Sequence, residues 1–254
     1  MSREHYIEEA SLSVAWARAL WIAAAGRKRE TGPLTITITG FGDDGTVHET
    51  PAIRAALNSV LAAAKKQPVD TVARTIFPHS MWNKAQPRPV LFERYERSLP
   101  RIKRASPKNR DGLYFERMIS GGPPNAQNQL EHAISAYLAR RGVRRSALQV
   151  ATFDPSKDHS TSAQKGFPCL QHVTFAPCHG VLNVNAFYAS QYLVERGYGN
   201  YLGLCRLGQF VAHELGLPFN RFTCLVGIAK CELSKKKVAA VFDALNQATV
   251  AVGT

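Results

Sequence analysis

A cysteine followed by a histidine stands in the most strongly patterned stretch of this sequence. Cys178 and His179 lie between two runs of β-forming residues, 170–175 and 180–187, and Arg196 follows downstream. Only the thiolate form of cysteine is a strong nucleophile, and a nearby cation favours that form. We therefore expect an activated thiol at Cys178, with His179 as its supporting residue and Arg196 as its cation.

Arginines occur at two further points where an anion can bind. Arg144 and Arg145 lie between a predicted helix and a predicted strand, and Arg29 lies in a charged loop after the first predicted helix. Guanidinium groups are permanently charged and bind phosphate oxygens in bidentate fashion. With Arg196 they fit a phosphorylated ligand. The plainer interpretations are a basic helix C-terminus for Arg144 and Arg145, and a surface loop for Arg29.

The central block resembles the thymidylate synthase family. In that family the catalytic cysteine sits in a Pro-Cys-His motif, followed by a strand pair and an Arg-Ser-x-Asp-x-x-Leu-Gly segment that opens a long apolar helix. This chain has Pro177-Cys178-His179, then RGYGNYLG over 196–203, then an apolar helix predicted over 204–217. The spacing from cysteine to arginine is also close to that of the family.

The resemblance implies a mechanism. The Cys178 thiolate would add to C6 of a pyrimidine nucleotide, and C5 would then attack a one-carbon unit carried by methylenetetrahydrofolate. Arg196 would bind the nucleotide phosphate. Tyr114 falls near a tyrosine that lines the family's pocket, and Arg29 falls near its phosphate-binding loop arginine.

The resemblance also implies an α/β (α+β) fold. We expect a large mixed sheet with helices on one face and the other face buried in a homodimer. In the dimers of the family, an arginine pair crosses the interface to hold the phosphate of the partner subunit's nucleotide. Arg144 and Arg145 align with that pair.

Several positions depart from the family. The asparagine that reads the pyrimidine edge falls at Leu207, and the aspartate that reads the folate ring falls at Gly199. The His-x-Tyr pair that anchors the ribose falls at Lys230 and Glu232, which become candidate readers of a different ligand. The proton-relaying glutamate has no counterpart on the predicted helix 52–65. We expect a methyl or hydroxymethyl transferase, related to pyrimidine hydroxymethylases, that acts on another phosphorylated pyrimidine or related nucleotide.

Two alternatives remain open. The pairing of Cys178 with Arg196 favours an enzyme. The absence of the family's residues that recognise the base, the ribose and the folate favours a homologue that binds nucleotide or nucleic acid without turnover. Four residues of zinc-ligand type, Cys169, His172, Cys178 and His179, also lie in a short window. Neighbouring residues on a strand point to opposite faces, which makes a single tetrahedral site awkward for Cys178 and His179, so we expect no metal.

Length, charge and cysteine usage set the broad class. The chain has 254 residues without a visible repeat, so we expect one thymidylate-synthase-like domain over 1–254, with an irregular insert or lid over 84–125. We expect no membrane segment, and the five cysteines without framework spacing predict a reducing, cytoplasmic compartment. The formal net charge of +13 favours an anionic partner, either a nucleotide or a nucleic acid.

Periodicity and breaker residues predict the elements that position these residues. The expected helices are 9–25, 52–65, a segment within 68–82, 125–139, 204–217 and 234–247. The expected strands are 34–39, 147–153, 170–175, 180–187 and 222–228.

Overall fold

The computed structural model describes residues 5–120, 128–139, 142–159, 161 and 168–250, and in these ranges the chain forms a mixed α/β fold around a seven-stranded sheet. The strands are β1 (His5–Glu9), β2 (Glu30–Thr31), β3 (Leu34–Ile38), β4 (Gln149–Ala151), β5 (Leu170–Cys178), β6 (Val181–Tyr192) and β7 (Phe219–Lys230). The helices are α1 (Leu12–Ala25), α2 (Pro51–Ala63), α3 (Val69–Ile76), α4 (Arg88–Ala105), α5 (Tyr114–Ser120), α6 (Gln129–Ala139), α7 (Pro155–Asp158), α8 (Tyr198–Leu215) and α9 (Lys235–Val250).

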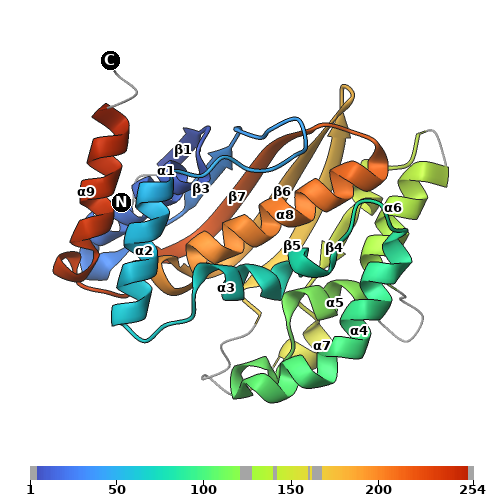
Figure 1. Ribbon diagram of the computed structural model, residues 1–254, viewed down its shortest axis with the longest axis horizontal. Coiled ribbons are helices and arrows are strands. Elements are labelled where there is room, and N and C mark those ends of the chain that lie inside the picture. Colours follow the sequence, from blue (N-terminus) through green and yellow to red (C-terminus); the bar gives the residue numbers. More distant parts are fainter. Residues whose placement is uncertain (1–4, 121–127, 140–141, 160, 162–167, 251–254) are drawn as a thin grey trace.

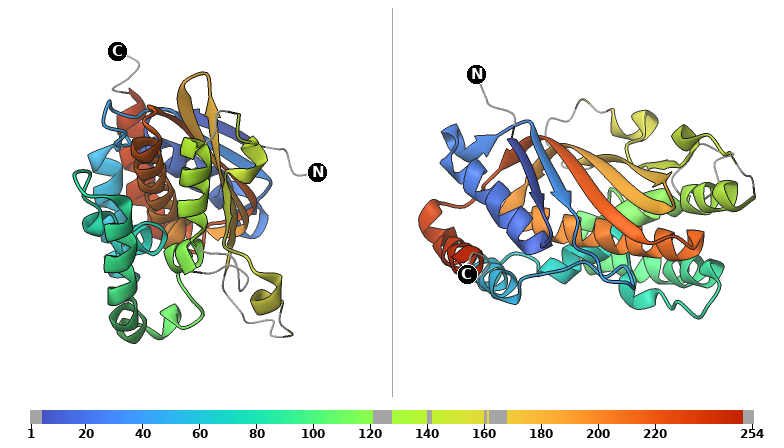
Figure 2. Two further views of the ribbon diagram at one scale, coloured as in Figure 1. Left: turned by 90° about the vertical axis from the view of Figure 1, so that its right-hand side faces the viewer. Right: turned by 90° about the horizontal axis from the view of Figure 1, so that it is seen from above.

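The sheet is mixed and its helices gather on one side. The strand order is β1-β3-β7-β6-β5-β4, with β2 pairing on β7. The β1–β3 and β6–β7 pairs are parallel and the other pairs are antiparallel. The long helices α1, α2, α4, α8 and α9 lie on the same side of this sheet (Figure 1, Figure 2). Over β1, β3 and β7 the opposite face carries no helix from the described ranges (Figure 2).

Two neighbouring rows of paired residues distinguish the two faces. Alternate side chains of a strand point to opposite faces, so a one-residue step moves from the core to the open face. The buried row is apolar across the sheet: Ile7, Ile36, Cys224, Ala186, Val173 and Val150. The next row is exposed or half-buried: Tyr6, Thr35, Leu225, Phe187 and His172.

The β5–β6 hairpin is longer than its sequence pattern suggests. The expected strand ended at residue 175, but β5 continues through Pro177 to Cys178. The two turn residues are His179 and Gly180, with φ of 51° and 81°, which is the combination that a type I′ turn requires. At its other end β6 continues past the expected limit of 187 to Tyr192.

Helix α8 is the centre of the core, and almost every one of its residues is buried. Two glycines one turn apart allow α3 to approach it closely. A Cβ added at Gly199 would lie 2.6 Å from the Cβ of Val72, and one added at Gly203 would lie 2.7 Å from the carbonyl oxygen of Ala73. Neither position tolerates a side chain without displacing α3, so these glycines are required by packing.

Two expectations are corrected by the structure. The range 84–125 is not an irregular insert over its described part, because it contains α4 and α5. Pro89 stands in the first turn of α4, where its missing N–H costs no hydrogen bond, and Leu91, Phe92 and Tyr95 bury one side of the helix. The first helix does not begin at Glu9, since residues 5–9 form β1. That short strand depends on its pairing with β3.

Candidate active site

The structure does not bring Cys178 and Arg196 together. Cys178 pairs with Val181 at the turn end of the hairpin, and β6 then runs to Tyr192 before the chain reaches Arg196. At ~3.3 Å per residue, the eleven steps from Val181 to Tyr192 span roughly 36 Å. The residues predicted to form one site therefore divide between the two ends of β6.

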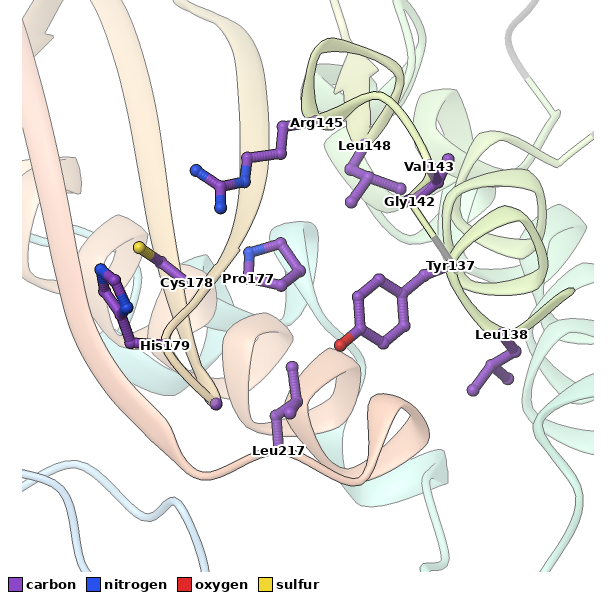
Figure 3. A pocket seen from close by; sticks show the side chains of 11 residues that line it. Tyr137, Leu138, Gly142, Val143, Arg145, Leu148, Pro177, Cys178, His179 and Leu217 are labelled. Carbon is purple, nitrogen blue, oxygen red and sulfur yellow. The ribbon is translucent and has the colours of Figure 1, made fainter. Parts of the chain in front are cut away.

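Cys178 lines a cavity of about 460 Å³ at the turn end of the hairpin (Figure 3). The guanidinium of Arg145 extends toward the Cys178 sulfur, and the His179 ring lies on the other side of that sulfur (Figure 3). The remaining lining residues are mostly apolar: Tyr137, Leu138, Gly142, Val143, Leu148, Pro177, Gly180 and Leu217. Arg145 thus lies beside the cysteine of its own chain, and both Arg145 and its neighbour Arg144 are exposed.

The other end of the hairpin holds a second cysteine. Cys169 lies immediately before β5, and its backbone N–H donates a hydrogen bond to the Tyr114 hydroxyl at 3.2 Å. The N–H of Leu170 donates to the same oxygen at 3.4 Å. Tyr114 begins α5, so this contact joins the helical layer to the start of β5. Burial raises the pKa of Tyr114 to about 12, which keeps its phenol protonated near neutral pH.

Ser190 and Arg196 complete the surroundings of Cys169. Burial raises the pKa of the Cys169 thiol, while a hydrogen bond with the Ser190 side chain and the positive charge of Arg196 act in the opposite direction. The Arg196 charge also acts to lower the pKa of Tyr114. The charge of Arg196 therefore acts on both groups, and Cys169, Ser190 and Tyr114 lie at the same end of the β5–β6 hairpin.

Three cations surround the carboxylate of Glu195, the residue before Arg196. Glu195 lies 2.6 Å from Lys66, 3.5 Å from Lys108 and 3.4 Å from Arg196, measured between nitrogen and oxygen atoms. Although burial acts to raise the pKa of Glu195, these cations hold it below its ordinary value. We call these four residues the Glu195 cluster. The cluster carries three positive charges against one negative charge, and the neighbouring Glu232 carboxyl is a further acidic group that acts on Glu195, so the positive excess favours an anion.

Glu232 positions the turn that carries Arg196. Its carboxylate accepts hydrogen bonds from the backbone N–H groups of Val194, at 3.0 Å, and Glu195, at 2.8 Å. These amides belong to the single π-helical turn Leu193–Gly197 that leads into α8. Burial nevertheless raises the pKa of Glu232. Glu232 thus acts on the cluster through the backbone of this turn.

Lys230 and Arg29 lie near the same end of β6, but both are engaged within the protein. Lys230 pairs with Tyr192 in the sheet, and its Nζ lies 2.7 Å from a carboxylate oxygen of Glu30. The Nε of Arg29 donates to the carbonyl oxygen of Cys231 at 3.2 Å. Arg29 thus holds the backbone directly after the C-terminal end of β7.

The positions aligned with the family's base and folate readers are closed by packing. Leu207 is fully buried within α8, and Gly199 lies against α3 without room for a Cβ. Neither position presents a polar group. These two positions therefore supply no contact to a base or to a folate ring.

Cys169 is the cysteine near Arg196 and Tyr114, and the sequence interpretation did not consider it as a nucleophile. A signal was available, because the dipeptide Pro168-Cys169 repeats Pro177-Cys178 nine positions upstream. The histidine that follows Cys178 makes only this second copy match the Pro-Cys-His motif. Only the length and pairing of the hairpin reveal which cysteine shares an end of the sheet with Arg196.

Neither a metal site nor a known relative identifies the function of this site. Within the described residues, no three or more His, Cys, Asp or Glu side chains are grouped so that they can hold a metal ion. No helix in the same ranges is both long and apolar enough to cross a membrane. No protein-family model matches the chain, and no curated protein matches it.

Proposed function

We propose that this protein is a thiol-dependent transferase of the thymidylate synthase type that acts on a phosphorylated pyrimidine or related nucleotide, with Cys169 as its nucleophile. The observation that carries the proposal is the convergence of Cys169, Tyr114 and Arg196 at one end of β6. Cys178 has Arg145 and His179 beside it instead, and Arg196 lies at the far end of the strand.

The chemistry follows from the residues around the thiol. After the Cys169 thiol transfers its proton to water, a sulfur lone pair forms a bond to C6 of the ring. The C5–C6 π electrons move toward C5 and the adjacent carbonyl, so that C5 becomes nucleophilic and takes up an electrophile or a proton. Loss of the C5 hydrogen as a proton and expulsion of the thiolate restore the double bond. Cysteine suits both steps because it is a good nucleophile and a good leaving group.

The Glu195 cluster supports recognition of the phosphate. Lys66, Lys108 and Arg196 come from three separate segments and point to one carboxylate. A phosphate can share these cations with Glu195, because charge-assisted hydrogen bonds to phosphate each contribute on the order of 1.5–3 kcal/mol. Base recognition must use other groups, because Leu207 and Gly199 supply none.

The open sheet face supports a homodimer. Leu225 and Tyr6 occupy the exposed row, with 42% and 63% of their surface accessible. A sheet face with large exposed apolar side chains is suited to contact a second copy of itself.

Hydrogen exchange at C5 tests the reaction without a one-carbon donor. Reversible addition of the thiol to C6 allows C5 to exchange its hydrogen with solvent. We expect the protein to incorporate deuterium at C5 of uridine or cytidine monophosphates, or their deoxy forms, in D₂O, as measured by proton NMR. Cys169→Ser should abolish exchange and the matched variant Cys178→Ser should retain it. Exchange that survives Cys169→Ser would exclude Cys169 as the nucleophile.

One observation favours a second function, binding without turnover. Burial raises the pKa of Cys169, so the resting site holds a thiol rather than a thiolate. In that case calorimetry would detect nucleoside monophosphates binding at Arg196, while no C5 exchange would occur. Binding that disappears in Arg196→Ala together with absent exchange would establish this alternative.

A further inference from the structure

Helix α4 has a basic side that its packing does not use. Its apolar side, formed by Leu91, Phe92 and Tyr95, is buried against the core. Arg97, Arg101 and Arg104 are exposed and recur at intervals of four and three residues. At ~100° per residue, this spacing places all three on the side of the helix opposite the apolar residues.

These arginines differ from the other basic residues of α4. Arg88 pairs with Glu131 and Glu214, Arg94 donates to the carbonyl oxygen of Met81, and Lys103 pairs with Glu116. Within the described ranges, Arg97, Arg101 and Arg104 form no ion pair with a carboxylate. Three neighbouring guanidinium groups therefore face solvent, where they are available to an external anion.

The row of charges leads toward the Glu195 cluster. Lys108 lies in the short turn Pro107–Asn109 that follows α4, and its Nζ lies 3.5 Å from Glu195. At a rise of ~1.5 Å per residue, the arginines from 97 to 104 span roughly 10 Å of the helix before the chain turns to Lys108. A linear polyanion can thus contact α4 and the active site at the same time.

We propose that Arg97, Arg101 and Arg104, the α4 basic face, bind the phosphodiester backbone of a single-stranded nucleic acid. This inference rests on the proposed function, because it makes the substrate base part of a strand instead of a free mononucleotide. A single strand is required because a base held inside a duplex cannot reach a catalytic thiol.

The packing of α4 argues against two other partners. A membrane-binding helix inserts an apolar side between lipids, but the apolar side of α4 is already buried in the core. A partner protein with an acidic groove would contact the arginines, yet it would not explain why the row leads to Lys108 and the Glu195 cluster. A strand of regularly spaced phosphates fits both observations.

Fluorescence anisotropy with a labelled pyrimidine-rich strand of about 12 nucleotides tests the surface, since single-strand sites commonly span ~4–16 nucleotides. The test variant is Arg97→Ala/Arg101→Ala/Arg104→Ala. The matched control is Lys235→Ala/Lys236→Ala/Lys237→Ala, which removes the same charge from the start of α9. Circular dichroism melting establishes that both variants fold.

We expect the α4 variant to weaken strand binding by at least about tenfold and to reduce the slope of log K against log salt by about 2, because each lost phosphate contact contributes ~0.7 to that slope for single strands. The α9 variant should match the wild type. Equal weakening in both variants, or full competition by polyglutamate at the same charge concentration, would overturn the proposal.

Exchange assays separate this inference from the proposed function. Deuterium should enter C5 of pyrimidines in the strand, and the α4 variant should impair this exchange while leaving mononucleotide exchange unchanged. If mononucleotides exchange but strands neither bind nor exchange, the strand proposal fails and the proposed function stands. If strand binding depends on α4 but no substrate exchanges, the basic face stands as a binding surface and the transferase proposal fails.

Discussion

The hydroxyl oxygen of Tyr114 lies 3.2 Å from the backbone nitrogen of Cys169, across a sequence separation of 55 residues. It also accepts the N–H of Leu170, so one phenol holds the first two residues at the start of β5. The contact fixes the backbone beneath the thiol from the side of α5. The position of the proposed nucleophile therefore depends on a helix that lies far from it in the sequence.

Removal of the Tyr114 hydroxyl should make the backbone that carries the Cys169 thiol less rigid. Tyr114→Phe leaves two backbone N–H groups without their acceptor, and we expect a loss of about 1 kcal/mol in the free energy of unfolding, within the usual range for one hydrogen-bonding group. The rate of hydrogen exchange at C5 should fall by more than the small decrease in the fraction of folded protein would cause. Urea unfolding and NMR exchange measure the two effects. Tyr137→Phe, in the Cys178 cavity, is the control and should leave exchange unchanged.

The charge of Arg196 should set the pH at which Cys169 becomes reactive. Burial raises the pKa of this thiol and Arg196 acts to lower it, so Arg196→Ala should move the alkylation profile to higher pH. Arg196→Lys should restore most of the shift, because it keeps the positive charge. The measurement is the rate of iodoacetamide labelling of Cys169 against pH in a Cys178→Ser background. An unchanged profile in Arg196→Ala would show that the guanidinium does not act on the thiol.

Glu232 should make stability depend on pH in a defined direction. Burial raises its folded-state pKa above the unfolded value, so its favourable contribution is fully present below the unfolded pKa and is lost as pH rises through the folded pKa. We expect the stability of Glu232→Gln relative to the wild type to increase with pH above the ordinary glutamate range of about 4.3. Urea unfolding of both proteins from pH 4 to 8 measures the difference. A constant difference would contradict the burial effect.

Dimerisation through the open sheet face should be sensitive to one central residue. Leu225 lies in the exposed row, so Leu225→Asp places a charge in the proposed interface with little effect on the core. We expect sedimentation at micromolar concentration to give a dimer for the wild type and a monomer for this variant. Leu138→Asp, also at an exposed leucine but on α6, should remain dimeric. A monomeric wild type would exclude the proposed assembly.

Much of the architecture follows from local sequence patterns. The alternation in 170–187 predicted the β5–β6 hairpin, and the apolar run after Arg196 predicted the buried helix α8. The breaker residues around Leu34 and Phe222 delimited β3 and β7. These predictions succeeded because neighbouring residues determine strand alternation, helix periodicity and the positions where an element ends.

Other features were decided by contacts between distant segments. The prolines of α4 suggested an irregular segment, but burial of Leu91, Phe92 and Tyr95 stabilises a helix that tolerates Pro89 in its first turn. β1 carries no strong strand pattern and exists because it pairs with β3. Local propensity is weak in both places, and tertiary packing therefore determines the structure.

The choice between the two cysteines as the proposed nucleophile depends on the same two kinds of information. From the sequence alone, Pro-Cys occurs twice, and a following histidine makes Cys178 the more prominent copy. The sequence also placed Arg196 and Tyr114 among the site residues. What it could not show is that β6 extends to Tyr192 and carries Arg196 away from Cys178, so that Tyr114 and Arg196 meet at Cys169. Residue types are local properties, whereas the end of a sheet at which they meet depends on strand length and register, which only the assembled tertiary structure determines.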